Sequence, residues 1–136
     1  VLALRDGWYV TGDIAFLDAQ GYIHITDRLS RFSKIGGEMV PHGRIEEALH
    51  MAAGVEPTVF AVTSVPDKRK GESLAVLHTF DKKKVQDLIH ALHDQGLPNL
   101  FIPKPDHFIK IKEMPLLGNG KLDLKKLKNT ALEQLA

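Results

Sequence analysis

The lysine at position 121 lies in a short segment whose residue types favour a turn. Pro115 restricts its own backbone and biases the residue before it to extended geometry, whereas Gly118 and Gly120 permit left-handed or close-approach backbone. An ammonium at the tip of such a turn can enter another surface as a point charge among phosphate or carboxylate oxygens. The segment is not a Walker-type phosphate loop, because Leu122 replaces the Ser or Thr that would hold magnesium. Taken alone, it is more typical of a plain surface loop with a hydrated lysine.

Two further segments carry polar groups next to glycines. Asp13 follows Thr-Gly at the end of a predicted strand, where its carboxylate could accept hydrogen bonds from the vicinal hydroxyls of a ribose. An Asx-turn that shapes only its own backbone is the alternative. Residues 28–34 place cations ahead of Gly36 and Gly37, which suits an anionic ligand that approaches the backbone closely. A charged, hydrated hairpin face is the alternative for this second segment.

Other chemistries find little support in the residue spacing. His90 and His93 have the i, i+3 spacing of a helical metal pair, but no third ligand is specified, so we predict no metal site. The lysines within 82–84 and 121–128 have no aromatic residues between them, which favours hydrated helix faces over a nucleic-acid surface. No Ser-His-Asp arrangement or paired carboxylates can be assembled from the spacing.

The composition is that of one domain-sized globular unit. The chain has 136 residues, of which 43% are hydrophobic and 26% are charged. Its net charge is only +1, so its overall electrostatic potential does not favour binding to nucleic acid or to an anionic membrane. It contains no cysteine, which excludes disulfides and thiolate chemistry and fits a reducing compartment. No apolar run approaches the roughly 18 residues of a membrane-spanning helix. These features predict a location on the cytoplasmic side.

Hydrophobic periodicity and turn residues predict an α+β domain. We expect a small, largely antiparallel sheet flanked by two or three helices and preceded by a β-hairpin. The segment 31–40 is predicted to be extended with a break at the glycine pair. The predicted strands are 8–10, 14–17, 22–26, 58–65, 72–80 and 107–112, and the predicted helices are one from Pro41 to Gly54, one over 83–95 and one over 124–135.

Four motifs occur in a specific order, at 7–13, 27–37, 65–72 and 115–121. This order resembles the carboxyl-terminal portion of the acyl-adenylate-forming (AMP-binding) enzymes, which include acyl-CoA synthetases, luciferases and non-ribosomal peptide adenylation domains. The finer pattern of 27–42 resembles one branch, the acyl-acyl-carrier-protein synthetase part of bifunctional 2-acylglycerophosphoethanolamine acyltransferases. The resemblance extends over nearly the whole chain.

The resemblance implies roles for individual residues in a ligase that uses ATP and Mg²⁺. Asp13 would bind the ribose hydroxyls of ATP, and Arg28 would contact its ribose and phosphate. Lys121 would be the adenylation lysine, which reaches the acyl carboxylate and the α-phosphate. Such enzymes form an acyl-AMP from a fatty acid and then transfer the acyl group to a phosphopantetheine thiol of acyl carrier protein or CoA.

Between the two half-reactions the small domain of such enzymes rotates about a hinge, so that a different loop faces the active site. Ser30 stands at the hinge position, where the family commonly has Asp or Lys. Gly36, Gly37 and Glu38 match the loop that lines the pantetheine channel, where missing side chains leave room for the arm.

The resemblance also implies a division of the chain. Residues 1–29 would end the large amino-terminal adenylation domain and include the hinge, and 30–136 would form the mobile lid. The rest of that large domain would be this lid's partner and would hold most of the ATP and Mg²⁺ contacts, so we expect the chain alone to be inactive. The branch further implies phospholipid metabolism and a full-length protein at the inner membrane. A non-catalytic module that binds a carrier protein or a nucleotide is the alternative, although such a module has no need of the lysine turn.

Overall fold

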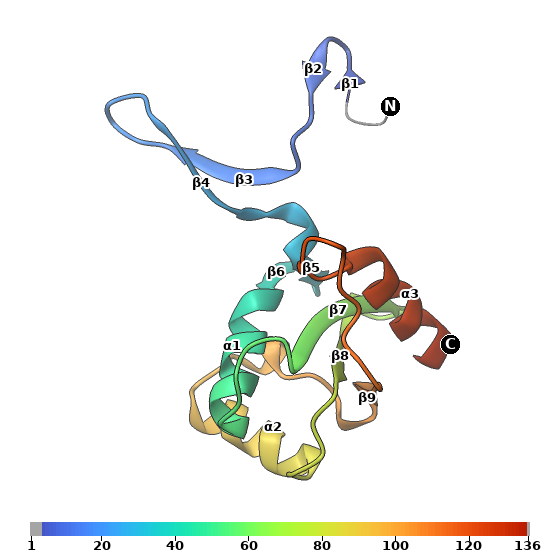
Figure 1. Cartoon of the computed structure of the whole chain (residues 1–136). Helices are drawn as coiled ribbons and strands as arrows, with labels where there is room; N and C mark the ends of the chain where they lie inside the picture. Colours follow the sequence, from blue (N-terminus) through green and yellow to red (C-terminus); the bar gives the residue numbers. More distant parts are fainter. Residues whose placement is uncertain (1–3, 136) are drawn as a thin grey trace. The chain divides into compact units, whose positions relative to one another are not determined.

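The computed structural model describes residues 4–135 (Figure 1). The chain divides into two compact units, Val1–Phe32 and Ser33–Ala136, and each is described by itself. None of the helices within the described residues is both long enough and apolar enough to cross a membrane.

The first unit consists of two antiparallel strand pairs. Strands β1 (Leu4–Arg5) and β2 (Trp8–Tyr9) form a short pair, and β3 (Asp13–Leu17) and β4 (Ile23–Arg28) form a longer hairpin. The turn of the longer hairpin is shaped by Asp18, whose carboxylate accepts hydrogen bonds from the backbone amides of residues 20 and 22, both at 2.9 Å. None of the residues from 4 to 32 is buried.

The second unit contains a three-stranded sheet and three α-helices. Its chain runs through β5 (Phe32–Ile35), β6 (Glu38–Pro41), α1 (His42–Ala53), β7 (Phe60–Asp67), β8 (Gly71–His78), α2 (Val85–Asp94), β9 (Phe108–Lys110) and α3 (Leu124–Leu135). Single turns of 3₁₀-helix lie at Asn99–Phe101 and Pro105–His107, and a third, Leu29–Arg31, lies near the end of the first unit. Strands β5 and β6 form a separate hairpin, and the main sheet has the order β7-β8-β9.

Alternation along β7 and β8 divides the core between the two faces of the main sheet. Val62 and its partner Val76 point to one face and pack with residues of α1 and α2, whereas Ala61 and its partner Leu77 point to the other face and pack with α3. Strand β8 is central: it pairs with β7 antiparallel and with β9 parallel. The result is a helix–sheet–helix arrangement, with β7 between α1 and α3 (Figure 1).

The outer edge of β7 is bonded to side chains of α1. The imidazole Nε2 of His50 accepts hydrogen bonds from the backbone amides of Val59 at 3.2 Å and Phe60 at 3.1 Å. The carboxylate of Glu46 accepts a hydrogen bond from the backbone amide of Val62 at 2.8 Å. Since His50 accepts through Nε2, its proton is on Nδ1 whenever the ring is neutral. These bonds fix α1 along the edge of the sheet as well as across its face.

The predicted fold class is confirmed, and the differences concern strand pairing and element ends. The glycine pair does interrupt an extended segment, since it joins β5 to β6, and the last helix has the predicted bounds. The predicted start at Trp8 and the predicted end at Leu17 are also exact, and the other predicted ends differ by one or two residues, as with the segment 107–112, which is reduced to Phe108–Lys110. The parallel pairing of β8 with β9 was not predicted, because a three-residue strand has no periodicity that indicates its neighbour.

Candidate functional site

Lys121 lies in a tight turn that the backbone closes twice. An isolated bridge joins Leu116 to Leu122, the amide of Leu117 donates to the carbonyl of Lys121 at 2.7 Å, and the amide of Gly120 donates to the carbonyl of Leu117 at 2.9 Å. Gly120 has a φ of +81°, the left-handed conformation that the sequence allowed for. Gly118 does not take a positive φ, so the turn depends on only one of the two glycines in this way.

The base of the lysine turn is held by buried and helical residues. Pro115 is buried, and its carbonyl accepts a hydrogen bond from the amide of Asp123 at 2.9 Å. The carboxylate of Asp123 in turn accepts from the amide of Lys126 at 3.0 Å, in the manner of a cap at the start of α3. The Lys121 side chain is exposed, and within residues 4–135 its ammonium has no hydrogen bond or ion pair. A free cation is therefore presented on a turn with a fixed base.

Two open hollows border the lysine turn. Leu122 contributes to one of about 580 Å³, which is otherwise lined by α1 and the segment that follows it. Pro115 and Leu116 contribute to another of about 510 Å³, which is shared with α3.

Asp13 and Arg28, the predicted nucleotide contacts, are brought together in the first unit. They are cross-strand partners in the β3–β4 hairpin, and Arg28 Nε lies 3.0 Å from Asp13 Oδ1. Arg28 Nη1 also donates to the carbonyl of Thr11 at 3.0 Å. The Arg28 side chain is 64% exposed and that of Asp13 is 21% exposed. An exposed ion pair contributes only about 0–1 kcal/mol to stability, so folding alone gives little reason for this pair.

A register shift in the hairpin decides which residue faces Asp13. Ala15 pairs with Ile25, and the same register continued by two residues would place Asp13 opposite Asp27. The shift between Ile14 and Ala15 instead places Asp13 opposite Arg28. A local irregularity therefore replaces a repulsive carboxylate pair with an ion pair.

Gly36 and Gly37 form the turn between β5 and β6. Their φ angles are +57° and +87°, and a two-residue hairpin turn of type I′ requires positive φ at both positions. A Cβ atom added to either would meet no other atom within 4 Å among the described residues. Backbone conformation explains both glycines, and the space beside them is open. Glu38 follows as the first residue of β6 and is exposed.

Ser30 lies in the single 3₁₀ turn Leu29–Arg31, just before the boundary between the two compact units. It is exposed, and the turn around it is held by the amide of Leu29, which donates to the carbonyl of Gly12 at 2.8 Å. Its role as a hinge stays a prediction, as does the division into 1–29 and 30–136.

Three polar residues near the glycine turn were given no role by sequence reasoning. Ser33 Oγ and His42 Nε2 share a hydrogen bond of 2.5 Å, and both residues are buried, so they tie the start of β5 to the start of α1. The carboxylate of Glu72 accepts hydrogen bonds from two other strands. None of the three follows a spacing rule that would have indicated its contacts, although Glu72 does lie in one of the four motifs.

Metal ligands do not converge anywhere in the described part of the chain. His90 and His93 are both exposed on α2, and residues 4–135 contain no group of three His, Cys, Asp or Glu side chains placed to hold an ion. We therefore assign no step to Mg²⁺ through this chain.

The chain belongs to the AMP-binding superfamily, and known proteins with similar sequences include acyl- and aryl-CoA ligases. A feruloyl-CoA synthase of Amycolatopsis sp is 36% identical over 121 residues, which is 88% of this chain and 24% of that protein. A long-chain-fatty-acid–CoA ligase of Bacillus subtilis (strain 168) is 31% identical over 121 residues, 88% of this chain and 21% of that protein. The chain thus spans about a quarter of the length of the curated relatives it matches. No family model matches the chain.

Solved structures of the same kind share the fold. ATP-bound MatB from Rhodopseudomonas palustris superposes with a TM-score of 0.69 at 27% identity, over 95% of this chain and 25% of that one. The o-succinylbenzoate CoA synthetase MenE from Bacillus subtilis, in complex with the acyl-adenylate OSB-AMP, also gives 0.69, at 25% identity over 93% of this chain and 25% of that one. The similarity supports the α+β fold and an origin among ATP-dependent ligases.

Proposed function

We propose that this chain is the carboxyl-terminal lid of an ATP-dependent acyl-activating ligase. The observation that carries the proposal is Lys121, a free ammonium on a turn whose base is fixed by Pro115 and α3. Movement of the Lys121 ammonium into another site breaks no hydrogen bond or ion pair in this chain, because within residues 4–135 it forms none. The same residue can therefore enter and leave an active site formed mostly by another part of the protein.

The chemistry of acyl activation accounts for the lysine. A carboxylate attacks the α-phosphate of ATP, an acyl-AMP forms, and pyrophosphate leaves. Both reactants are anions, so negative charge accumulates as they approach. A preorganised cation that is desolvated on domain closure stabilises that charge most in the transition state. Lys121 supplies this charge in the proposal.

The ion pair of the first unit supplies nucleotide contacts in the same proposal. Asp13 would accept hydrogen bonds from the two ribose hydroxyls, and Arg28 would reach the ribose and a phosphate. Arg28 already spans from Asp13 to the carbonyl of Thr11, so its guanidinium is oriented before any nucleotide binds. Preorganisation of this kind reduces the entropy lost on binding.

The second half-reaction uses the glycine turn. A phosphopantetheine thiol attacks the acyl carbonyl of the acyl-AMP, a thioester forms, and AMP leaves. Gly36 and Gly37 would line the path of the pantetheine arm, with Glu38 beside them. Ser30 would be the pivot that exchanges the lysine turn for the glycine turn.

The finer proposal concerns the acceptor. The names of the relatives support CoA, whereas the pattern of residues 27–42 supports acyl carrier protein and a fused acyltransferase. Purified full-length protein should be offered CoA or holo-carrier protein at equal concentration with labelled fatty acid. Preferred acylation of the carrier protein supports the branch, and acylation of CoA alone contradicts it.

The proposal as a whole is tested by Lys121→Ala in the full-length protein. Pyrophosphate exchange, which reports acyl-AMP formation, is expected to fall by about 10²–10³, the usual effect of losing one preorganised electrostatic donor. Lys125→Ala is the matched control, because Lys125 is an exposed lysine on the neighbouring first turn of α3. Unchanged exchange in Lys121→Ala, or an equal loss in both variants, would contradict the assignment.

A further inference from the structure

The glycine turn is tied to the main sheet through one carboxylate. Glu72 Oε2 accepts a hydrogen bond from the backbone amide of Lys34 at 2.6 Å, and Glu72 Oε1 accepts from the hydroxyl of Ser64 at 2.7 Å. Lys34 is on β5, two residues before Gly36, whereas Ser64 is buried on β7. Both oxygens of Glu72, at the start of β8, are thus occupied, and the carboxylate connects three strands.

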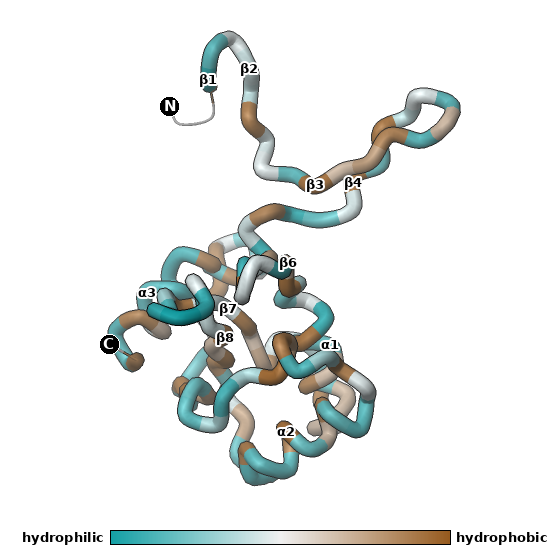
Figure 2. Tube along the Cα trace, turned by 180° about the vertical axis from the view of Figure 1, so that it is seen from behind, coloured by the Kyte–Doolittle hydropathy of each residue, from teal (hydrophilic) through white to brown (hydrophobic). Residues whose placement is uncertain are grey.

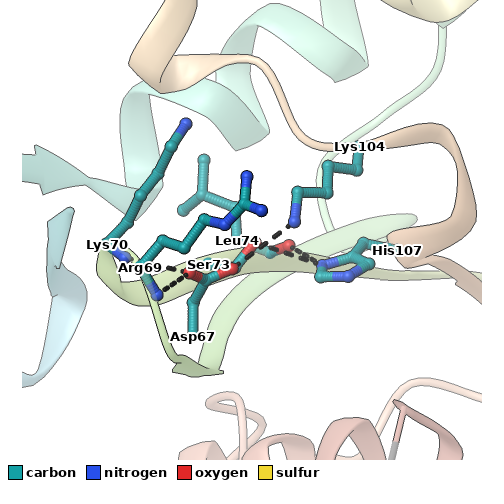
Figure 3. A network of polar contacts seen from close by, with 7 residues as sticks. All are labelled: Asp67, Arg69, Lys70, Ser73, Leu74, Lys104 and His107. Carbon is teal, nitrogen blue, oxygen red and sulfur yellow. Dashed lines mark hydrogen bonds and ion pairs between the residues drawn. The ribbon is translucent and has the colours of Figure 1, made fainter. Parts of the chain in front are cut away.

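The β7–β8 turn supplies a second connection to the glycine turn. The carbonyl of Lys70 accepts a hydrogen bond from the amide of Gly36 at 2.9 Å. Lys70 is itself held by Asp67, whose Oδ1 accepts from the backbone amides of Arg69 at 2.8 Å and Lys70 at 2.9 Å (Figure 3). These bonds lower the pKa of Asp67, the amides of Lys70 and Arg69 contributing most.

Lys104 joins the same network from the segment before β9. Its ammonium lies 3.4 Å from Asp67 Oδ2, on the other side of the carboxylate from the two amides (Figure 3). The β7–β8 turn is therefore held by hydrogen bonds of Asp67 to its own backbone and by the contact of Asp67 with Lys104. The glycine turn is bonded to this turn through Lys70 and to the start of β8 through Glu72.

We infer that Glu72 is the positioning residue of the glycine turn, and that it acts in thioester formation and not in adenylation. The inference rests on the proposed function for the roles of the two half-reactions. Among the described residues no atom lies within 4 Å of a Cβ position at Gly36 or Gly37, so these two residues make no side-chain packing, although Ile35 beside them is buried in the core. Two hydrogen bonds from main-chain amides tie the segment to β8 and the turn before it, and the shorter of them ends on Glu72.

Removal of this carboxylate has a predictable consequence. Glu72→Ala leaves the amide of Lys34 without its acceptor and frees the β5 strand to shift relative to the sheet. A misplacement of about 1 Å near a reacting group can cost about 10²-fold in rate. We expect transfer of the acyl group from supplied acyl-AMP to the thiol to fall by roughly 10- to 100-fold, with pyrophosphate exchange within about twofold of the unchanged protein. Within residues 4–135 no hydrogen bond joins the Lys121 turn to Glu72, so we expect the first step to be spared.

Two control variants separate positioning from general destabilisation. Glu72→Gln keeps an oxygen for the Lys34 amide, and its amide group can donate to Ser64 Oγ, since a hydroxyl also accepts. This variant should restore most of the thioester step. Glu46→Ala removes a different carboxylate that accepts a backbone amide, that of Val62, and should lower both half-reactions by the same small factor.

A direct readout uses the 136-residue chain and no catalysis. In Glu72→Ala, the amides of Lys34 and Gly36 should exchange with solvent at least about tenfold faster, while amides of β8 keep their protection. Unchanged exchange at both amides, or equal loss of both half-reactions in the full-length protein, overturns the inference. If full-length protein without substitutions forms no acyl-AMP, the proposed function fails, whereas the exchange result still tests the contact.

Discussion

The two compact units of this chain use apolar residues in opposite ways. In the unit of residues 33–135, side chains such as Leu77 and Val62 are completely buried on the two faces of one sheet. In the unit of residues 4–32 none is buried, although apolar residues are frequent there too (Figure 2). Trp8 is 78% exposed and Ile23 is 72% exposed. Composition alone therefore does not distinguish a self-sufficient unit from one that lacks a core.

The β3–β4 hairpin shows how the first unit differs. Alternation places Leu17, Ile23 and Ile25 on one face, and the stacked rings of Phe16 and His24 on the other, with centroids 4.8 Å apart. A contiguous apolar face of this kind is typical of a surface that another part of a protein covers. An isolated two-stranded hairpin is at best marginally stable in water. The comparison indicates that the second unit has a buried core of its own and that residues 4–32 of the first unit have none.

The largest expected effect is a difference in the free energy of unfolding between a substitution in the second unit and one in the first. Leu77→Ala should lower the free energy of unfolding of the 136-residue chain by about 2–5 kcal/mol, because it leaves a cavity in a filled core. Ile23→Ala should change it by less than about 0.5 kcal/mol, because that side chain is already in water. Urea unfolding followed by circular dichroism measures both. A comparable loss in the two variants would mean that the first unit has a core of its own.

The next largest effect is on ATP binding by the first unit and not on its stability. Asp13→Asn in the full-length protein should raise the KM for ATP by about 10- to 100-fold, the magnitude of one or two hydrogen bonds to a charged group. The 136-residue chain with the same change should keep its unfolding midpoint, since the ion pair with Arg28 is exposed. Asp18→Asn is the control: it alters the turn of the same hairpin without touching the pair. An unchanged KM in Asp13→Asn would argue against a nucleotide contact.

The smallest effect is a difference in pH dependence. Burial lowers the pKa of His78 below its ordinary value of 6.5, against the opposing effect of its hydrogen bond with the Phe80 carbonyl. The charge of Lys110 also lowers the pKa, and that of Asp81 raises it. The folded state thus disfavours the charged form of the ring. The contribution of His78 to stability is fully present above pH 6.5 and is lost as the pH falls through the lowered pKa of the folded state.

The first unit should respond only at lower pH. Its Asp18 has a pKa below the ordinary 3.8, chiefly because the ring of His24 bonds to it, so its contribution is lost only as the pH falls below that value. Because His78 loses its contribution as the pH falls below 6.5, the urea concentration at the unfolding midpoint should decrease between pH 7 and pH 5 in the unchanged chain. The decline should be smaller in His78→Asn, where the amide group can still donate to the Phe80 carbonyl but does not titrate. Parallel declines in the two proteins would exclude His78 as the cause.

The sequence predicted those features that depend on neighbours along the chain. Leu127 and Ala131 recur on one face of a helix, and α3 has the predicted bounds, because helical periodicity is a local signal. Gly36 and Gly37 predicted a break between two strands for the same reason. Features that depend on register were not predictable, since the shift at Ile14 that places Asp13 opposite Arg28 leaves no mark in the residue types.

The candidate site follows the same division. The turn beside Lys121 follows from Pro115 and Gly120, both within a few residues of it, but Lys121 itself lies just after the tip, opposite Leu117. The contacts of Glu72 join three strands that are up to 38 positions apart in the chain, and no rule of spacing reaches that far. Local chemistry therefore indicated the residues on which the proposed function rests, and only the structure showed the contacts of Glu72 with β5 and β7.

The bonds from α1 to the edge of β7 also bear on how this protein avoids aggregation. An outermost strand normally presents unpaired amides, on which a strand of another molecule can assemble. Here the outward amides of Phe60 and Val62 are already donated to His50 and Glu46. That edge consequently offers no free donor at these two positions to a growing β-aggregate. The helix that covers one face of the sheet also blocks intermolecular strand addition along its side.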